Sequence, residues 1–395
     1  MLPDASILPK PRCIQLPAAE HPEVSLLIPA TSQAVALAAC LQSLADHLPA
    51  SVPCEVIVVL NAATTGVEHL VREECHGLRI AASEANLGVA GGFNLARSLA
   101  RGRFLMLLHD DVEIGPGWLE PLLAMAAEYP EAGALGSRAL NSDGSPQRAG
   151  SFLFRNGQTC AASETDSPGP WPVDYVGTCA TLVPALWWDA VGGMDEAIFP
   201  AYYVDVDLCL RLQQLGASVF CVPASPVLHH GGSSSASAIK AFYTSRNRSW
   251  FCQKHASLLD DYEPWVPGDP AAPARARERT LARAARLVAG QDALPQAQNS
   301  AFDPAAQQAR HFKMELALQK AWAVDLHGQL ESSREASAAI RLRERQLKAK
   351  LEEKNQQIAT LKARCKALKN NGKRPSFFRR LGQWLTGKKP TPPAS

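Results

Sequence analysis

Short apolar runs alternate with stretches of helical periodicity near the start of the chain. Four short runs are largely apolar, 24–28, 56–60, 78–81 and 104–108, and 78–81 is the least regular of them. Between the first two, residues 35–48 place apolar side chains at helical spacing. Strands that are apolar on both faces and separated by helices are typical of a parallel sheet covered on each side. The pattern therefore predicts an α/β domain, with Pro29 ending its first strand.

Shifts in composition divide the chain into segments. In order, we expect an irregular lead-in, an α/β domain, a linker rich in Pro, Ala and Arg, a coiled coil and a basic tail, at 1–23, 24–263, 264–304, 305–372 and 373–395. Within the linker, one basic helix is expected around 275–288.

A heptad repeat runs from Leu316 to Leu368, and eleven of its sixteen a and d positions are apolar. A helix of this length would extend ~80 Å at a rise of about 1.5 Å per residue. The persistent stripe favours a coiled coil, so we expect a homodimer or higher oligomer that becomes monomeric when residues 305–395 are deleted. The alternative is a single charged helix, solvated all round or folded back on the body.

Composition places the chain among ordinary globular proteins, because 46% of its 395 residues are hydrophobic and 20% are charged. The sequence contains no apolar run of ~18 residues for a transmembrane helix, and no signal-peptide pattern near Met1. Its ten cysteines are scattered without a CxxC pair, which is typical of reduced thiols. We therefore expect a cytoplasmic protein.

The net charge of +2 is unevenly distributed. From residue 305 onward the charge is +13, and the first 304 residues carry −11. Because the basic residues alternate with Glu on a predicted helix, and aromatic residues appear only at its far end, we expect no nucleic-acid partner. The basic segment must have a separate role.

A short amphipathic segment, 375–385, places two Phe, two Leu and Trp384 on one face, with Lys and Arg around it. This pattern suits the headgroup boundary of an anionic membrane. We expect peripheral attachment at the inner face of the membrane. The alternatives are a disordered basic end, or docking of the apolar face on the protein's own body.

Candidate chemistry begins where the run 104–108 leads into His109-Asp110-Asp111-Val112-Glu113. Ligands of α/β sheets lie beyond the carboxyl ends of the strands. Carboxylates at that place suit Mg²⁺ or Mn²⁺, which would bridge the phosphates of a substrate. The alternative is a helix cap beside a solvated charge.

A glycine-rich segment, 86–94, precedes a helical stretch at 95–100. Glycines permit close approach of a ligand to the backbone, and a following helix N-terminus favours phosphate. The segment does not fit GxGxxG, so a dinucleotide fold is not indicated. A tight strand-to-helix turn explains it equally well.

Further along, a helix is expected to open at Tyr202, with Asp205 and Asp207 in its first turn. These carboxylates either favour the helix dipole or place a general base in a cleft. His229 and His230 end another apolar run, and an isolated His is more often structural than a ligand.

Taken together, these motifs resemble family 2 glycosyltransferases, and most closely the rhamnosyltransferase-like branch that builds bacterial surface polysaccharides. The motifs are Asn-Leu-Gly-x-Ala-Gly-Gly-x-Asn at 86–94, Asp-Asp at 110–111, Gly-Gly-Met-Asp-Glu at 192–196, Asp-x-Asp-Leu-x-x-Arg at 205–211 and His-His-Gly-Gly at 229–232. The resemblance covers about 24–262 and implies a GT-A fold. It also implies inverting transfer of a sugar, with rhamnose suggested, from a nucleotide-diphosphate donor to a saccharide or lipid-linked acceptor.

Site roles follow from the resemblance by position. Asp205 is the implied catalytic base. The implied ligands of Mn²⁺ or Mg²⁺ are Asp111, Asp110 and His229, with Glu113 assisting and His230 the rival of His229. The implied donor-side residues are Pro29, Asn61, Asn86, Gly88, Gly91, Gly92, Asn94 and Asp110. The implied acceptor-side residues are Asp195, Asp207 and Trp188.

Two positions depart from the family pattern. Leu60 stands where an acid usually helps to hold the nucleobase, and Val204 replaces the acidic neighbour of the base. These departures support an alternative, a catalytically degenerate transferase that acts as a coiled-coil scaffold at the membrane. Because Asp110, Asp111, Asp205 and His229 all remain, we favour an active enzyme.

Overall fold

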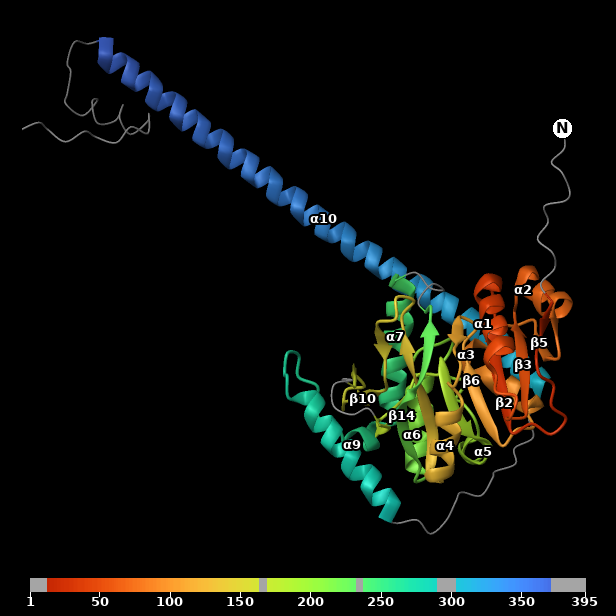
Figure 1. The fold of residues 1–395 in the computed structure, drawn as a ribbon. Coiled ribbons are helices and arrows are strands. Elements are labelled where there is room, and N and C mark those ends of the chain that lie inside the picture. Colours follow the sequence, from red (N-terminus) through yellow and green to blue (C-terminus); the bar gives the residue numbers. More distant parts are fainter. Residues whose placement is uncertain (1–12, 163–168, 232–236, 290–302, 371–395) are drawn as a thin grey trace, which may run out of the picture. The chain divides into compact units, whose positions relative to one another are not determined.

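The structure is a computed structural model that describes residues 13–162, 169–231, 237–289 and 303–370. The chain forms two compact units, Met1–Gln319 and Lys320–Ser395. The first contains a ten-stranded sheet with its main strands in the order β12-β14-β8-β13-β6-β2-β3-β5 (Figure 1). Two short pairs, β1–β4 and β10–β11, lie outside this sheet.

The parallel half of the sheet confirms the four predicted strands. They are β2 (Val24–Ala30), β3 (Cys54–Asn61), β5 (Arg79–Ser83) and β6 (Phe104–Leu108). The remaining strands are β1 (Ile14–Gln15), β4 (Cys75–His76), β7 (Val112–Ile114), β8 (Ala132–Leu140), β9 (Pro146–Arg148), β10 (Ser151–Leu153), β11 (Thr159–Ala161), β12 (Trp171–Pro172), β13 (Ala180–Pro184) and β14 (Ser218–His229).

The predicted parallel pairing holds for the four predicted strands, but the sheet as a whole is mixed. Strand β13 runs antiparallel to both β6 and β8. Between β8 and β13 the chain contains only short strands and connections, with no helix among the described residues. A parallel return would need a long crossover, usually a helix.

Pro29 lies inside β2 and is paired with Val59, so the expectation that it ends the strand is wrong. On its other side, the pairing of β2 with β6 ends at Leu27. Proline lacks an N–H, and is tolerated where the ladder has no partner for that group.

Helices cover both faces of the sheet. They are α1 (Ala34–His47), α2 (Thr65–His69) with a π-helical turn at Leu70–Glu74, α3 (Gly88–Leu99), α4 (Glu120–Glu128), α5 (Ala185–Val191), α6 (Val204–Gln214), α7 (Ser237–Lys254), α8 (Ala256–Leu259), α9 (Ala272–Ala289) and α10 (Pro304–Asn370). Alternation along β2 sends Leu26 to a core that contains Leu37 of α1, and Leu27 to a core that contains Phe93 of α3.

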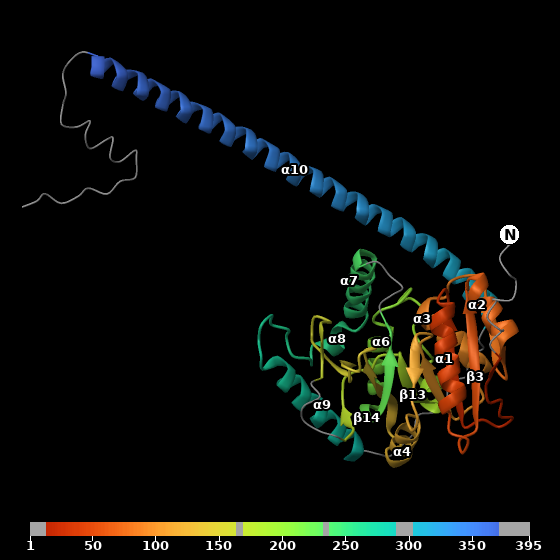
Figure 2. The same cartoon turned by 45° about the horizontal axis from the view of Figure 1, so that its top comes forward.

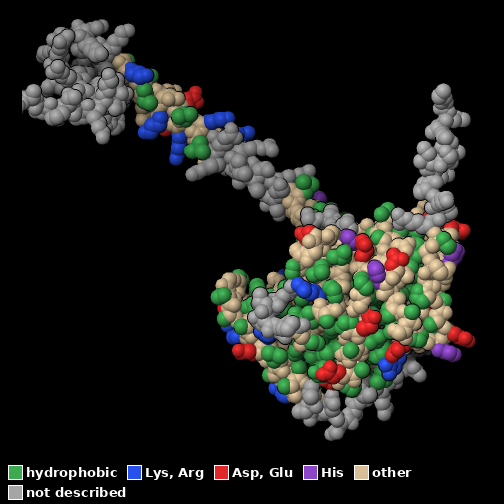
Figure 3. All heavy atoms as spheres, in the orientation of Figure 1, with side chains coloured by type: hydrophobic (Ala, Val, Ile, Leu, Met, Phe, Trp, Pro, Cys, Tyr) green, Lys and Arg blue, Asp and Glu red, His purple; other side chains and the backbone are tan. Residues whose placement is uncertain are grey.

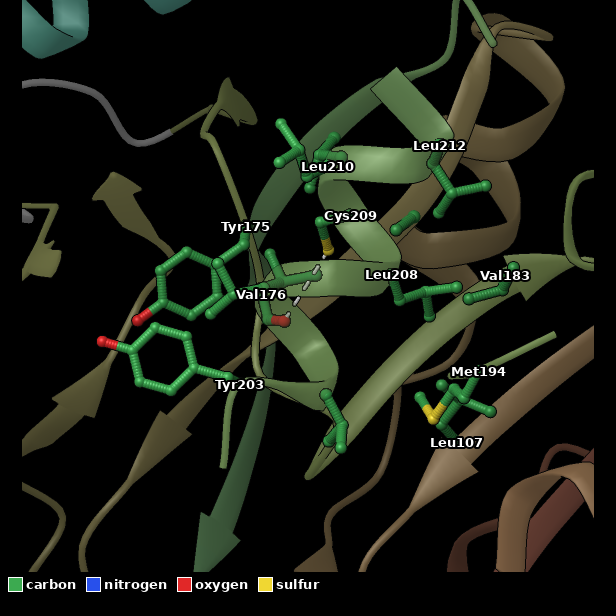
Figure 4. Close-up of a cluster of buried hydrophobic side chains, with 14 of the residues drawn as sticks. Leu107, Tyr175, Val176, Val183, Met194, Tyr203, Leu208, Cys209, Leu210 and Leu212 are labelled. Carbon is green, nitrogen blue, oxygen red and sulfur yellow. Dashed lines mark hydrogen bonds between the residues drawn. The ribbon is translucent and has the colours of Figure 1, made fainter. Parts of the chain in front are cut away.

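The core that contains Leu27 and Phe93 continues beneath α6. Figure 4 shows Leu208 of this helix directed toward Val183 of β13, and Met194 beside Leu107 of β6. The Sγ of Cys209 also lies 4.0 Å from the backbone oxygen of Val176. This packing fixes the first turn of α6 relative to the carboxyl ends of the strands.

The basic helix expected in the linker is present as α9 and contacts β10 and β12. Figure 2 shows α9 at the same end of the sheet as β14. Arg279 forms ion pairs with Asp174 and Glu263, and Thr280 donates to Asp174 over 2.9 Å. Helix α9 therefore packs on the α/β domain, and the expected segment boundaries stay a prediction.

The long C-terminal helix expected from the heptad is present as α10. Its first turns belong to the compact unit, because Gln307, His311 and Leu318 are buried there. Beyond Trp322, which is half-buried, the described apolar side chains are exposed, and Figure 3 shows apolar side chains interspersed with basic groups along this helix. The coiled-coil pairing of this helix stays a prediction.

No helix in the described ranges is both long and apolar enough to cross a membrane. The amphipathic segment 375–385 lies outside the described residues.

Candidate active site

Three side chains converge beyond the carboxyl end of β6. Ligand atoms of His109, Asp111 and His229 all lie within 4.8 Å of one another. His109 and Asp111 follow β6 directly, and the register of β14 on β7 places His229 opposite Val112. Two imidazoles and a carboxylate at this spacing could hold a divalent cation.

Asp111 has an oxygen that fits this role. Its Oδ1 is buried and makes no hydrogen bond within the described part of the chain, while Nε2 of His229 lies 3.3 Å away. Burial alone would raise the pKa of Asp111, but the nearby imidazoles of His229 and His109 lower it below its usual value. The carboxylate is therefore ionised at neutral pH.

Burial and neighbouring side chains determine the protonation of His109 and the orientation of His229. His109 lies 3.1 Å from Oγ1 of Thr178, and burial lowers its pKa to about 4, so its ring is neutral and keeps a lone pair. Nδ1 of His229 lies 2.6 Å from Oε1 of Gln147, and Nε2 of Gln147 donates to the backbone oxygen of His229 over 2.9 Å. Gln147 therefore fixes the orientation of His229.

The other expected ligands lie outside this trio. His230 contacts Oε1 of Glu113 at 2.6 Å and Oγ of Ser142 at 2.9 Å, so both of its ring nitrogens are occupied. Asp110 is directed elsewhere, with the backbone N–H of Thr31 as a partner. Burial and the charge of Asp111 raise the pKa of Asp110 to about 6. The structure thus favours His229 over His230.

Asp205 occupies the first turn of α6, as expected. It is half-buried, and its Oδ1 accepts a hydrogen bond of 3.0 Å from the backbone N–H of Val206. Burial raises the pKa of Asp205, and the guanidinium of Arg148 opposes that rise. A carboxylate with a raised pKa is a stronger base than an exposed one.

The loop before β13 lies between Asp205 and the cation-binding trio. A side chain at Gly177 would contact Oδ2 of Asp205 at 3.9 Å, and the next residue, Thr178, contacts His109. Burial, together with the charges of Asp111 and Asp205, raises the pKa of Cys179 to about 11. Three consecutive residues thus bring the expected base and the expected metal site to one place.

Asp207 does not lie on an open acceptor surface. It is fully buried, and its oxygens bind Arg211 at 2.7 Å, Lys254 at 2.6 Å and His255 at 2.8 Å. The hydrogen bond from His255 and the charges nearby overcome burial and lower its pKa to about 2. Contrary to the expectation from the sequence, Asp207 therefore does not contact an acceptor, but holds α6 to Lys254 of α7 and to His255, which follows that helix.

The other two expected acceptor-side residues, Trp188 and Asp195, differ from each other in burial. Trp188 is 2% exposed and belongs to the core, so it cannot contact an acceptor directly. Asp195 is half-buried, and its carboxylate binds Lys254 at 2.6 Å and the backbone N–H of Ala197 at 2.9 Å. Its place in the loop expected to line the acceptor side stays a prediction.

On the donor side, Asn61 fixes the start of the glycine-rich segment. Its side chain accepts from the N–H of Leu87 over 2.7 Å and donates to the oxygen of Gly88 over 3.2 Å. Asn86 accepts from the N–H of Gly88 over 2.9 Å. These polar side chains bind backbone groups of the segment itself, and their contact with a donor stays a prediction.

Gly91, Gly92 and Asn94 of the glycine-rich segment contact other parts of the protein and do not face an open cavity. The glycines lie in α3 itself, which begins at Gly88, earlier than expected. A Cβ on Gly92 would lie 2.8 Å from Pro29, and a Cβ on Gly91 would lie 2.9 Å from His311. Asn94 binds Met194 and Glu196, so its contacts are to the 192–196 loop.

A pocket of about 690 Å³ lies beyond the carboxyl ends of β3 and β5. Its lining residues are Leu60, Ala62, Ala63, Glu68, Ala82, Ser83, Glu84 and Gln308. Six of these lie in the last residues of the two parallel strands or directly after them, whereas Glu68 comes from α2 and Gln308 from α10. Ligands of α/β sheets are expected at this edge.

Several residues of the site were not expected from the sequence. His109 stands in the quoted His-Asp-Asp motif, so its signal was present. Arg148 and Gln147 lie on the short polar strand β9, which carries no periodic signal. Gln308 is separated from the pocket's other residues by more than 200 positions, and no local pattern marks it.

Comparison with known proteins agrees with these motifs. Residues 25–182 match the family described as Glycosyl transferase family 2. N-acetylglucosaminyl-diphospho-decaprenol L-rhamnosyltransferase of Mycobacterium tuberculosis is 30% identical over 208 residues, which span 45% of this chain and 67% of that protein. O-antigen biosynthesis protein RfbC of Myxococcus xanthus is 29% identical over 153 residues, 36% of this chain and 12% of that protein. The chain belongs to glycosyl transferase family 2.

Solved structures show more distant likeness. GalNAc-T7 with UDP, GalNAc and Mn²⁺ has a TM-score of 0.48 at 14% identity, over 59% of this chain and 48% of that one. The mannosyltransferase PcManGT from Pyrobaculum calidifontis, in complex with GDP-Man and Mn²⁺, has a TM-score of 0.46 at 17% identity, over 80% and 84%.

Proposed function

We propose that this enzyme is an inverting, metal-dependent glycosyltransferase that moves a sugar from a nucleotide-diphosphate donor to a hydroxyl of a saccharide or lipid-linked acceptor. One observation carries the proposal. The loop Gly177–Cys179 lies beside Asp205 and also beside His109 of the cation-binding trio. An inverting transfer needs a base for the acceptor and a charged group for the leaving diphosphate at adjacent positions.

His109, Asp111 and His229 would hold the cation. A neutral imidazole, an unbonded carboxylate oxygen and a second imidazole fit a divalent ion, and the nitrogen ligands favour Mn²⁺ over Mg²⁺. When bound there, the cation stabilises negative charge on the departing diphosphate.

Asp205 acts as the general base. Its carboxylate takes the proton from the acceptor hydroxyl while that oxygen forms a bond to the anomeric carbon of the donor sugar. The bond from that carbon to the diphosphate breaks, and the nucleotide diphosphate carries the electron pair away. The proton remains on Asp205, whose pKa is raised by burial and which is therefore suited to accept it.

The names of the relatives support a role in polysaccharide synthesis. The mycobacterial enzyme transfers L-rhamnose to a decaprenol-linked acceptor, as its name states, and the Myxococcus protein is named for O-antigen biosynthesis. By this likeness, rhamnose is the proposed sugar and a lipid-linked saccharide the proposed acceptor. Attachment of the basic tail to an anionic membrane would place the enzyme beside such an acceptor.

A donor screen of the purified full chain with Mn²⁺ tests the function, with nucleotide release as the readout. Replacement Asp205→Asn should lower kcat by about 10²–10⁴-fold, the typical contribution of a general base, and leave donor affinity nearly unchanged. The matched control is Asp46→Asn, on the exposed face of α1, which should not alter either quantity. Near-normal turnover of the Asp205 variant would exclude this base.

The scaffold alternative makes a different prediction. A degenerate transferase that only joins proteins through α10 should bind neither a nucleotide-diphosphate sugar nor Mn²⁺. Calorimetry of the wild-type chain with both therefore separates the two functions. Binding that depends on Asp111 supports the transferase.

A further inference from the structure

The first turns of α10 lie across the glycine-rich segment and the 192–196 loop. Nε2 of Gln307 donates to the backbone oxygen of Gly91 over 3.2 Å and also binds Glu196. His311, one turn later, is fully buried and stacks edge-on against Phe199 at 5.7 Å between ring centroids. This part of α10 is thus fixed to the donor side of the transferase domain.

The sequence of α3 is adapted to this contact. A Cβ on Gly91 would lie 2.9 Å from Nε2 of His311, closer than side chains pack. A glycine inside a helix is otherwise unfavourable by about 1 kcal/mol relative to alanine. Glycine at position 91 therefore makes room for the close approach of α10.

Gln307 and His311 face the domain, and Gln308, which follows Gln307, lines the pocket at the ends of β3 and β5. Its side chain makes no hydrogen bond within the part of the chain that the structure describes. The walls beside it are apolar and small: Leu60, Ala62, Ala63 and Ala82. A flat ring fits between such walls, and its polar edge would meet the carboxamide.

Charge decides which end of a nucleotide enters this pocket. The lining of the pocket includes Glu84, and Glu68, which pairs with Arg72 at 2.9 Å, but no Lys or Arg among the described residues. Carboxylates repel a diphosphate, and no cation of the lining would attract one. The phosphates must therefore lie away from the pocket, toward the cation-binding trio beyond β6. Because β2 separates β6 from β3 in the sheet, a nucleotide would extend along this edge with its base in the pocket.

We infer that Gln308 recognises the nucleobase of the donor, and so determines nucleotide specificity from a helix outside the strands that form the pocket. A carboxamide presents a donor and an acceptor side by side, which matches the paired acceptor and donor on the edge of a base. Leu60 offers no polar group for this purpose, so Gln308 supplies it. The inference rests on the proposed function, since it assumes a nucleotide-diphosphate donor.

The test is calorimetry of the full chain with Mn²⁺ and, separately, UDP, dTDP, GDP, ADP and inorganic pyrophosphate. Replacement Gln308→Ala should weaken binding of the preferred nucleoside diphosphate on the order of tenfold, the effect of one or two neutral hydrogen bonds. Its preference among the four bases should shrink, while pyrophosphate affinity stays unchanged. The matched control is Gln319→Ala, an exposed glutamine of the same helix, which should bind every ligand as the wild type does.

The outcomes separate the two hypotheses. If Gln308→Ala retains both the affinity and the base preference of the wild type, the inference is wrong and the proposed function stands. If the wild type binds pyrophosphate but no nucleoside diphosphate, or binds none of the ligands, the proposed function fails and this inference fails with it. Equal weakening of pyrophosphate and nucleotides in the variant would also overturn it, because a base contact cannot affect pyrophosphate.

Discussion

At the scale of single residues, the position of Asp205 depends on a strained turn. Tyr202 and Tyr203, just before it, have positive φ values of 66° and 68°, a region that bulky side chains rarely adopt. The buried Asn247 donates to the backbone oxygen of Ala201 over 2.7 Å, and the hydroxyl of Tyr203 donates to the oxygen of Gly157 over 2.7 Å. Such strain persists only where surrounding contacts impose it, and it is common at functional sites.

The guanidinium of Arg148 should control the pH dependence of catalysis. Burial raises the pKa of Asp205, and Arg148 limits that rise, so kcat of the wild type should fall as pH drops through the raised pKa. Replacement Arg148→Gln removes the opposing charge, raises that pKa further and should move the acidic limb of the pH–kcat profile to higher pH. Arg103→Gln, in the exposed pair with Glu23, serves as the control. If the acidic limb of the pH–kcat profile stays at the same pH in Arg148→Gln, Arg148 does not influence the pKa of Asp205.

Asp207 should contribute to stability above about pH 4. Its pKa in the folded state is about 2, below the usual 3.8, so its contribution is complete above the unfolded value and is lost as pH falls toward 2. Replacement Asp207→Asn removes the buried carboxylate that binds Arg211, Lys254 and His255, and should lower the free energy of unfolding by about 3–5 kcal/mol at pH 7.

Urea denaturation at several pH values checks this prediction. The difference in the free energy of unfolding between the wild type and Asp207→Asn should be constant above pH 5. Below pH 4 this difference should decrease by about 2 kcal/mol. The control is Asp189→Asn, in the half-buried pair with Arg97, which should cost less than about 1 kcal/mol. A pH-independent difference down to pH 3 would show that Asp207 titrates normally.

At the scale of elements, the alternating pattern predicted the strands and the helix of the parallel half. Residues 24–28 and 104–108 are apolar on both faces because helices cover both faces of the sheet there. The antiparallel β13 and the polar β9 were not predicted, because partner choice in a sheet depends on connections far along the chain. The same limit applies to the site. The carboxylates and His229 follow from local motifs, whereas Arg148 and Gln308 reach the site through tertiary packing alone.

The contact between α3 and α10 predicts opposite effects at two helical glycines. Replacement Gly91→Ala should lower the free energy of unfolding by about 1–3 kcal/mol, because the new methyl group overlaps His311 and Leu87. The matched change Gly66→Ala, in α2, should be neutral or stabilising by up to about 1 kcal/mol, since Ala34 lies 3.8 Å away. Urea denaturation compares them, and equal stabilisation of both variants would show that α10 does not pack on α3.

At the scale of the whole molecule, the place at which α10 leaves the domain decides how assembly should be tested. Deletion from residue 305 would remove Gln307 and His311, which are buried against the domain, so the proper cut is after Gln319. Beyond it, Leu347, Leu351 and Ile358 are 57%, 63% and 48% exposed along the heptad stripe. An apolar stripe without packing partners leaves a long helix marginal in water, so a second copy of the chain is the expected partner.

Light scattering should therefore find a dimer or higher oligomer for the full chain and a monomer for residues 1–319, with nucleotide affinity retained. The double replacement Leu351→Lys and Ile358→Lys places charge at two a positions and should also yield monomers, because two lysines cannot be buried in the seam without loss of its apolar contact. Gln356→Lys adds the same charge at the outward f position and should leave the subunit number unchanged. If the double variant and residues 1–319 both keep the subunit number of the full chain, α10 is not the oligomerising element, and the copies must associate through the transferase domain.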